Sequence, residues 1–133
     1  MLARTILVAD EDRDTRVILR TVLERYAFVI VEAATADDAR AAAQQLAPDL
    51  VILNYPMHSA DGRTLVQHLR ADPVTRAVPI LNLTSRVVPQ FLQAAADEGV
   101  NLTVAKPIDV EALLRVVSEL VEPALFRAGA STS

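Results

Sequence analysis

Polar side chains that could share one site follow four short apolar runs, at the point where each run ends. Asp10 and Glu11 follow the first run, Asn54 the third, Thr84 the fourth and Lys106 the fifth. The chain has no cysteine, which excludes disulfide and thiolate chemistry, so a site must use oxygen and nitrogen groups. Each feature alone is common in turns and helix caps, but their joint occurrence in this order favours a functional site.

Lys106 is the one lysine among 13 basic residues. One interpretation is that this position requires a compact ammonium, because the broad guanidinium of arginine would not fit there. The other is that Lys106 is a chance survivor in an arginine-rich composition. Composition leaves both open.

The elements that must position these residues form one α/β pattern. Five apolar runs are mostly continuous rather than alternating, which predicts buried strands of a parallel sheet covered on both faces, at 6–8, 29–31, 50–53, 80–83 and 102–105. Helical segments are expected near 14–26, 35–46, 61–71, 88–98 and 110–121, and the second and last carry apolar stripes that include Leu46 and Val110. Thr35 and Asp109 are expected to cap helix starts, and Gly99 a helix end. Because the carboxyl ends of parallel strands meet at one edge, the polar positions above should lie together.

Length and charge narrow the class of protein. A chain of 133 residues suits one domain, and 52% hydrophobic with 23% charged residues is typical of a soluble globular protein. Its longest apolar run is about six residues, against about 20 for a membrane span, and no signal peptide is evident. We therefore expect a cytoplasmic protein without a membrane association. A net charge of −4 argues against direct nucleic-acid binding.

Five stretches of the chain resemble response-regulator receiver domains of two-component signalling, of the chemotaxis-regulator type. They are Ile6–Asp12, Pro48–Asn54, Asp61-Gly62, Pro79–Thr84 and Lys106-Pro107. The resemblance covers residues 4–122, so we expect a receiver domain at 1–122 and a C-terminal tail or linker stub at 123–133. It implies a flavodoxin-like (βα)5 fold that is a signalling switch rather than an enzyme. Such a domain accepts a phosphoryl group on an aspartate from a histidine kinase or phosphotransfer protein, with Mg²⁺.

The resemblance also implies a role for each residue of the site. Asp10 and Glu11 match the acidic pair that holds Mg²⁺, and the backbone carbonyl of Pro56 matches the third protein ligand. Thr84 matches the hydroxyl residue that bonds the phosphoryl oxygen, and Lys106 matches the cation that pairs with it. Hard Mg²⁺ prefers such oxygen ligands, and positive charge around the transferred phosphoryl group stabilises its transfer.

The phosphoacceptor position holds Asn54 instead of aspartate. An amide is neutral at pH 7 and its oxygen is a poor nucleophile, so phosphorylation at residue 54 should be absent. Loss of this carboxylate leaves Asn54 as a weak metal ligand, so Mg²⁺ binding should be weak or absent.

Other departures affect the signalling surface and the loop at 55–62. Thr103 stands where the family usually has an aromatic residue. We expect His58 to be an exposed loop residue without a catalytic role, and His68 to lie on a helix surface. Retention of the other site residues suits an engineered Asp-to-Asn change or a recent natural loss. The altered loop and Thr103 suit a natural pseudo-receiver, which we favour.

We expect a protein–protein switch or docking module that contacts its kinase or phosphotransfer protein and a downstream protein. The contact surface should be the last two helices and the fifth strand, with Phe91, Leu92, Val116 and Leu125 as candidate apolar patches. Dimerisation through this surface is compatible with the sequence, which does not decide it.

The alternative is a flavodoxin-like small-molecule-binding or enzymatic domain. Flavin binding would need a phosphate loop after the first strand, where the acidic Asp10-Glu11-Asp12 stands. The loop at 56–61 also fails the Asp-x-His-x-x-Gly pattern of cobalamin domains, and neither a P-loop nor GxGxxG occurs.

Overall fold

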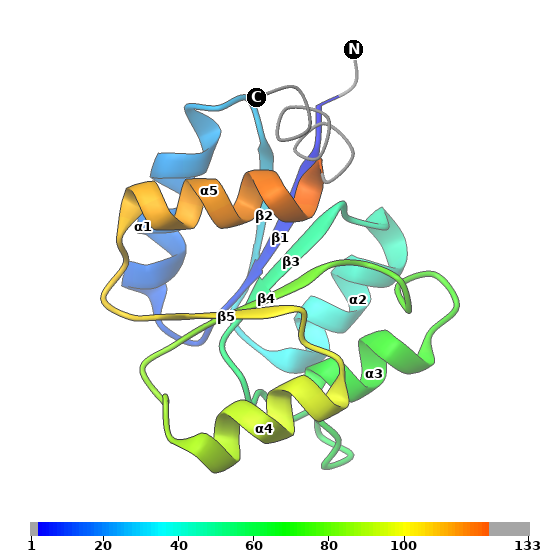
Figure 1. The fold of residues 1–133 in the computed structure, drawn as a ribbon. Coiled ribbons are helices and arrows are strands. Elements are labelled where there is room, and N and C mark those ends of the chain that lie inside the picture. The colour runs from blue at the N-terminus through cyan, green and yellow to red at the C-terminus, as the bar shows by residue number, and fades with distance from the viewer. Residues whose placement is uncertain (1–2, 123–133) are drawn as a thin grey trace, which may run out of the picture.

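The computed structural model describes residues 3–122, which form a five-stranded parallel sheet and five helices (Figure 1). Strands and helices alternate along the chain, as predicted. In chain order they are β1 (Thr5–Ala9), α1 (Arg13–Glu24), β2 (Val29–Ala33), α2 (Ala36–Leu46), β3 (Leu50–Leu53), α3 (Leu65–Ala71), β4 (Ile80–Thr84), α4 (Pro89–Glu98), β5 (Leu102–Ala105) and α5 (Val110–Val121). The predicted tail at 123–133 lies outside the described residues.

The strands lie in the order β2-β1-β3-β4-β5, and each pair is parallel. The chain moves outward in one direction from β1 to β2 and in the other from β3 to β5, so the order reverses between β1 and β3. Ligands of open α/β sheets bind beside the carboxyl ends of the strands at such a reversal. The last paired residues there are Ala9 and Leu53, directly before Asp10 and Asn54.

Alternate strand residues supply the two halves of the core, because successive side chains of a strand point to opposite faces. On one face, strand residues such as Leu7 and Val51 pack with buried residues of α2, α3 and α4. On the other, residues such as Ile6 and Ile52 pack with α1 and α5. The helices thus cover both faces, as Figure 1 shows, and the continuous apolar strands are explained by this double burial. Within residues 3–122, no helix is long and apolar enough to cross a bilayer.

The helix boundaries follow local capping chemistry. Thr35 and Asp109 accept hydrogen bonds from backbone N–H groups of the first turns of α2 and α5, as predicted. Thr64 forms a reciprocal capping box with Gln67 at the start of α3. Gly99 ends α4 with φ +121°, a conformation that disfavours a side chain.

Five predictions about burial are wrong. Val29, at the start of the edge strand β2, is 48% exposed. β5 is an edge strand and is mostly exposed, not buried, because β4 covers only one of its sides. Leu46 and Val110 lie at helix ends, beyond the reach of the core, and are exposed. His68 is buried rather than superficial, since it lies on the inner side of the short helix α3 with Leu65 and is paired with Asp61 at 3.0 Å.

Candidate functional site at the carboxyl edge of the sheet

An ion pair between Asp10 and Lys106 spans the carboxyl edge of the sheet. The Lys106 Nζ lies 3.0 Å from Asp10 Oδ2, and the side chains are 19% and 4% exposed. Because β3 and β4 stand between β1 and β5, the lysine stem crosses above their ends to reach Asp10. The second Asp10 oxygen accepts the backbone N–H of Asp12 at 2.8 Å. Asp10 is therefore a buried carboxylate with a partner at each oxygen.

Arg16 of α1 holds the loop that carries the acidic pair. Its guanidinium donates to the backbone carbonyls of Asp10 at 2.7 Å and Glu11 at 3.3 Å. The same guanidinium contacts the carboxylate of Glu32 at 3.1 Å, and Arg20 donates to Glu32 at 2.6 Å. These two arginines, Arg20 first, hold the pKa of Glu32 below its ordinary value. The loop after β1 is thus anchored to β2 by charged side chains.

Asn54 opens onto a small cleft of about 60 Å³ that Glu11, Pro56 and Arg86 also line. Asn54 is half-buried and Glu11 is exposed. The guanidinium carbon of Arg86 lies 5.7 Å from the centre of the Phe91 ring, within the range of a cation–π contact. The cleft therefore combines one carboxylate, one amide and one cation, and it extends toward the start of α4.

Thr84 is buried at the end of β4, and its backbone is paired with the strand that leads to Lys106. Its carbonyl accepts the N–H of Lys106 at 2.9 Å, and its hydroxyl oxygen accepts the N–H of Arg86 at 3.0 Å. The hydroxyl is thus held by the turn after β4, and its proton remains available to an acceptor in the site.

The donor set fits a hard cation, although poorly. Glu11, Asn54 and Pro56, which all carry oxygen donors, line one cleft, and Asp10 lies on the adjoining loop. Mg²⁺ accepts such ligands and keeps several waters, and about 60 Å³ has room for about two of them. Against this, Asp10 is already paired with Lys106, and Arg86 adds positive charge. In residues 3–122, no group of three or more acidic, histidine or cysteine side chains is placed to hold a metal.

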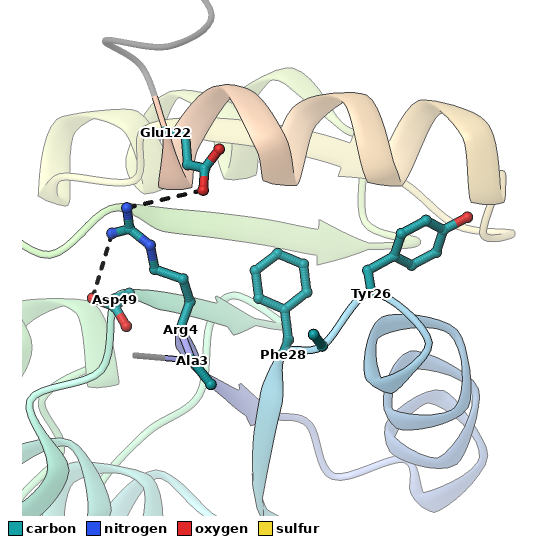
Figure 2. A pocket seen from close by; sticks show the side chains of 7 residues that line it. Ala3, Arg4, Tyr26, Phe28, Asp49 and Glu122 are labelled. Carbon is teal, nitrogen blue, oxygen red and sulfur yellow. Dashed lines mark ion pairs between the residues drawn. The ribbon is translucent and has the colours of Figure 1, made fainter. Parts of the chain in front are cut away.

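Another hollow, of about 660 Å³, lies at the opposite edge of the sheet (Figure 2). Arg4 lies there 3.9 Å from both Asp49 and Glu122, and Tyr26 and Phe28 also line the hollow. These charged groups are exposed and pair with one another, and none of the residues predicted for the site lines this hollow. The chemistry of the molecule is therefore expected at the carboxyl edge.

Residues 6–118 match the family model described as the response regulator receiver domain. The chain belongs to the response-regulator receiver family. The match covers the (βα)5 unit and every site residue predicted from sequence, so the predicted fold class and family are confirmed.

Relatives of this receiver include both short proteins and longer regulators. An uncharacterized 14.6 kDa protein of Leptolyngbya boryana is 32% identical, over 86% of this chain and 87% of that protein. The DNA-binding dual master transcriptional regulator RpaA of Synechocystis is 33% identical over 87% of the receiver but only 48% of its own length. Protein PilH of Pseudomonas aeruginosa is 25% identical over 87% of this receiver and 96% of PilH. The receiver therefore spans about half of some curated relatives and nearly all of others.

Solved structures show the same fold. The solution structure of a response regulator from Burkholderia multivorans has a TM-score of 0.75 and 32% identity, over 92% of this receiver and 98% of that chain. The chemotaxis protein CheY4 of Vibrio cholerae has a TM-score of 0.81 at 24% identity, over 90% and 99% of the two chains, which shows the fold alone. This receiver is thus a member of a family of signalling switches, which are not typical enzymes.

Sequence reasoning missed several residues that shape the receiver site. Arg86 was not singled out, although it lines the cleft beside Asn54. Asn82, inside an apolar strand, is only 2% exposed and accepts the backbone N–H of Tyr55 at 2.9 Å. A polar residue in a continuous apolar run is a signal that it has a buried partner, because an unpaired amide there would be costly.

Proposed function

We propose that this receiver is a protein–protein signalling switch that is not phosphorylated at residue 54. The observation that carries the proposal is the amide of Asn54 at the position of the family's phosphoacceptor, in the cleft that Glu11 lines. An amide oxygen has no negative charge with which to attack phosphorus. The neighbouring polar residues that the family uses are nevertheless retained, so the site is altered at its one nucleophile.

Each retained residue has a proposed role. Asp10 and Glu11 would hold Mg²⁺ weakly, with the Pro56 carbonyl as a third ligand and the Asn54 amide as a weak one. The metal, when bound, would neutralise charge on phosphoryl oxygens. Lys106 keeps Asp10 neutralised, and the paired ammonium supports the shape of the site without the metal.

Charge arithmetic supports weak metal binding. Asp10 and Glu11 give −2, and Lys106 with Arg86 gives +2, so these four side chains sum to zero before any ion arrives. An aspartate at residue 54 would bring the sum to −1. At about 4 Å and an effective dielectric constant of about 20, one unit charge changes the energy of a divalent ion by roughly 8 kcal/mol before desolvation is subtracted. Even a fraction of that energy separates a tight site from a weak one.

The docking surface is proposed at α4, β5 and α5. Phe91 is 36% exposed and Leu92 is half-buried, so both are accessible there. Val87 and Val88, directly before α4, are 49% and 45% exposed and enlarge this apolar surface. Val116 instead packs partly against the core, and Leu125 lies outside the described residues. Exposed apolar side chains gathered on one short segment are a candidate binding site for another protein.

Its partners are proposed to be a histidine kinase or phosphotransfer protein and a downstream protein, bound without a phosphorylation signal. We favour a natural pseudo-receiver over an engineered aspartate-to-asparagine form. The altered loop at 55–62, and Thr103 in place of the family's usual aromatic residue, support this origin.

The test is the affinity for the purified cognate kinase or phosphotransfer protein, measured by calorimetry with and without a small phosphodonor and Mg²⁺. We expect the same Kd in both conditions. The Phe91→Ser variant should weaken binding at least tenfold, because a central apolar contact is worth more than about 1.4 kcal/mol. Val74→Ser is the control, since Val74 is 54% exposed on the connection between α3 and β4. Binding that depends on the phosphodonor would refute the proposal.

A further inference from the structure

Two polar contacts hold Tyr55, the residue directly after Asn54. Tyr55 is only 5% exposed, and its backbone N–H donates to Asn82 Oδ1 at 2.9 Å. Asn82 in turn donates from Nδ2 to the Thr103 hydroxyl at 3.3 Å. The backbone beside Asn54 is thereby connected through β4 to a side chain of the edge strand β5.

The Tyr55 side chain makes the second contact, to the end of α4. Its hydroxyl donates to Glu98 Oε2 at 2.7 Å, and the hydroxyl of Thr64 donates to the other oxygen of Glu98. Hydrogen bonds to an ionised group are shorter and stronger than those between neutral groups. Burial, together with the Glu98 carboxylate, raises the pKa of the Tyr55 phenol, so the hydroxyl keeps its donating proton at neutral pH.

The two contacts hold Tyr55 at its backbone N–H and at its side-chain hydroxyl. Tyr55 cannot shift with the cleft unless the Asn82 contact, the Glu98 contact or both are broken or carried along. In a well-packed interior, such a change moves the partner elements because the atoms have little free space. The partners here are α4, through Glu98, and β4, through Asn82, which itself contacts Thr103 of β5. Both α4 and β5 belong to the proposed docking surface.

We infer that Tyr55 is a positioning residue that couples the cleft at Asn54 to α4 through Glu98 and to β5 through Asn82 and Thr103. The inference rests on the proposed function in one respect only, the assignment of α4 and β5 to a docking surface. The hydroxyl carries the connection to α4, and the backbone N–H carries the connection to β5. The two routes can therefore be separated by substitution.

The experiment perturbs residue 54 and follows the result by NMR. Asn54→Asp is made in the otherwise unchanged chain and in a Tyr55→Phe background, and backbone amide shifts are compared in Mg²⁺-free buffer. In the unchanged chain, Asn54→Asp should shift the amides of Thr103 and of residues 94–98. In the Tyr55→Phe background, the shifts at 94–98 should fall to less than a third, while that of Thr103 remains.

Tyr26→Phe is the matched control, because Tyr26 is the only other tyrosine and is 58% exposed at the opposite edge of the sheet. It should leave both sets of shifts unchanged. Glu98→Gln keeps the shape of the acceptor but removes its charge, and it should reduce the shifts at 94–98 only in part. This partial effect distinguishes coupling from a general loss of structure.

Equal shifts at 94–98 with and without the Tyr55 hydroxyl would overturn the inference, as would an Asn54→Asp variant that shifts neither region. Neither result would bear on phosphodonor-independent partner binding, so the failure of this inference is distinguishable from the failure of the proposed function.

Discussion

Removal of the Lys106 ammonium should leave Asp10 as a buried, uncompensated charge. We expect Lys106→Met, which keeps the apolar stem, to lower the free energy of unfolding at pH 7. At the observed 3.0 Å and an effective dielectric constant of about 20, the attraction is about 5 kcal/mol before desolvation. Breaking a buried pair costs about 3–5 kcal/mol, and the Lys106 side chain is 19% exposed, so we expect a loss of about 2–3 kcal/mol.

A second variant separates charge from packing. Adding Asp10→Asn to Lys106→Met removes the uncompensated charge but keeps an oxygen that can accept the Asp12 N–H. The double variant should therefore be more stable than Lys106→Met by at least about 1 kcal/mol. Arg115→Met is the control on the exposed face of α5 and should stay within about 0.5 kcal/mol of the unchanged chain.

The assay is urea unfolding followed by circular dichroism, with the slope against urea checked for constancy across variants. A Lys106→Met variant as stable as the unchanged chain would refute the reasoning. So would a double variant no more stable than Lys106→Met, because the loss would then come from packing rather than from the charge of Asp10.

Three further outcomes are expected. Gly99→Ala should lower the stability by about 1–2 kcal/mol in the same urea assay, because φ is +121° and a Cβ would lie 2.8 Å from the Arg70 side chain. Glu32 has a lowered pKa because of Arg20, so its ionised form stabilises the fold above its ordinary pKa of 4.5, and this stabilisation is lost as the pH falls through the folded-state pKa. Glu32→Gln should accordingly be less stable at pH 7 and show a flatter stability profile below pH 4.5 in acid titrations. Without Mg²⁺, the Asn54→Asp variant should have a lower thermal midpoint than the unchanged chain. Added Mg²⁺ should restore the midpoint of the variant and change that of the unchanged chain little, as scanning calorimetry can measure.

The strands and their carboxyl ends could be predicted because a strand that is buried on both faces has a nearly continuous apolar sequence. Mostly continuous apolar runs indicated the parallel strands, and the polar residues that follow four of them indicated the edge at which a site is expected. Asp10 and Lys106 are 96 positions apart in the chain, yet both follow predicted parallel strands, which was enough to expect them at one edge of the sheet. Capping by Thr35 and Asp109 depends only on a few neighbouring residues, so the local sequence was enough to predict it.

The remaining features depend on packing between residues that lie far apart in the chain, and no local sequence pattern indicates it. β5 has an apolar composition like a central strand, but its place at the edge follows from the whole strand order. His68 is buried because α3 is only seven residues long and its inward side includes the histidine. The contacts of Tyr55 with Asn82 and Glu98 join residues 27 and 43 positions apart, so their pairing appears only in three dimensions.

The most direct test of the central claim offers a small phosphodonor, such as acetyl phosphate, with Mg²⁺ to the chain and to its Asn54→Asp variant, and reads both by intact mass spectrometry. We predict one phosphoryl group on the variant and none on the chain, because we propose that Asp10, Glu11, Thr84 and Lys106 keep the roles they have in the family and that Asn54 removes the nucleophile. A phosphorylated unchanged chain, or a variant that stays unmodified, would contradict this account of the site.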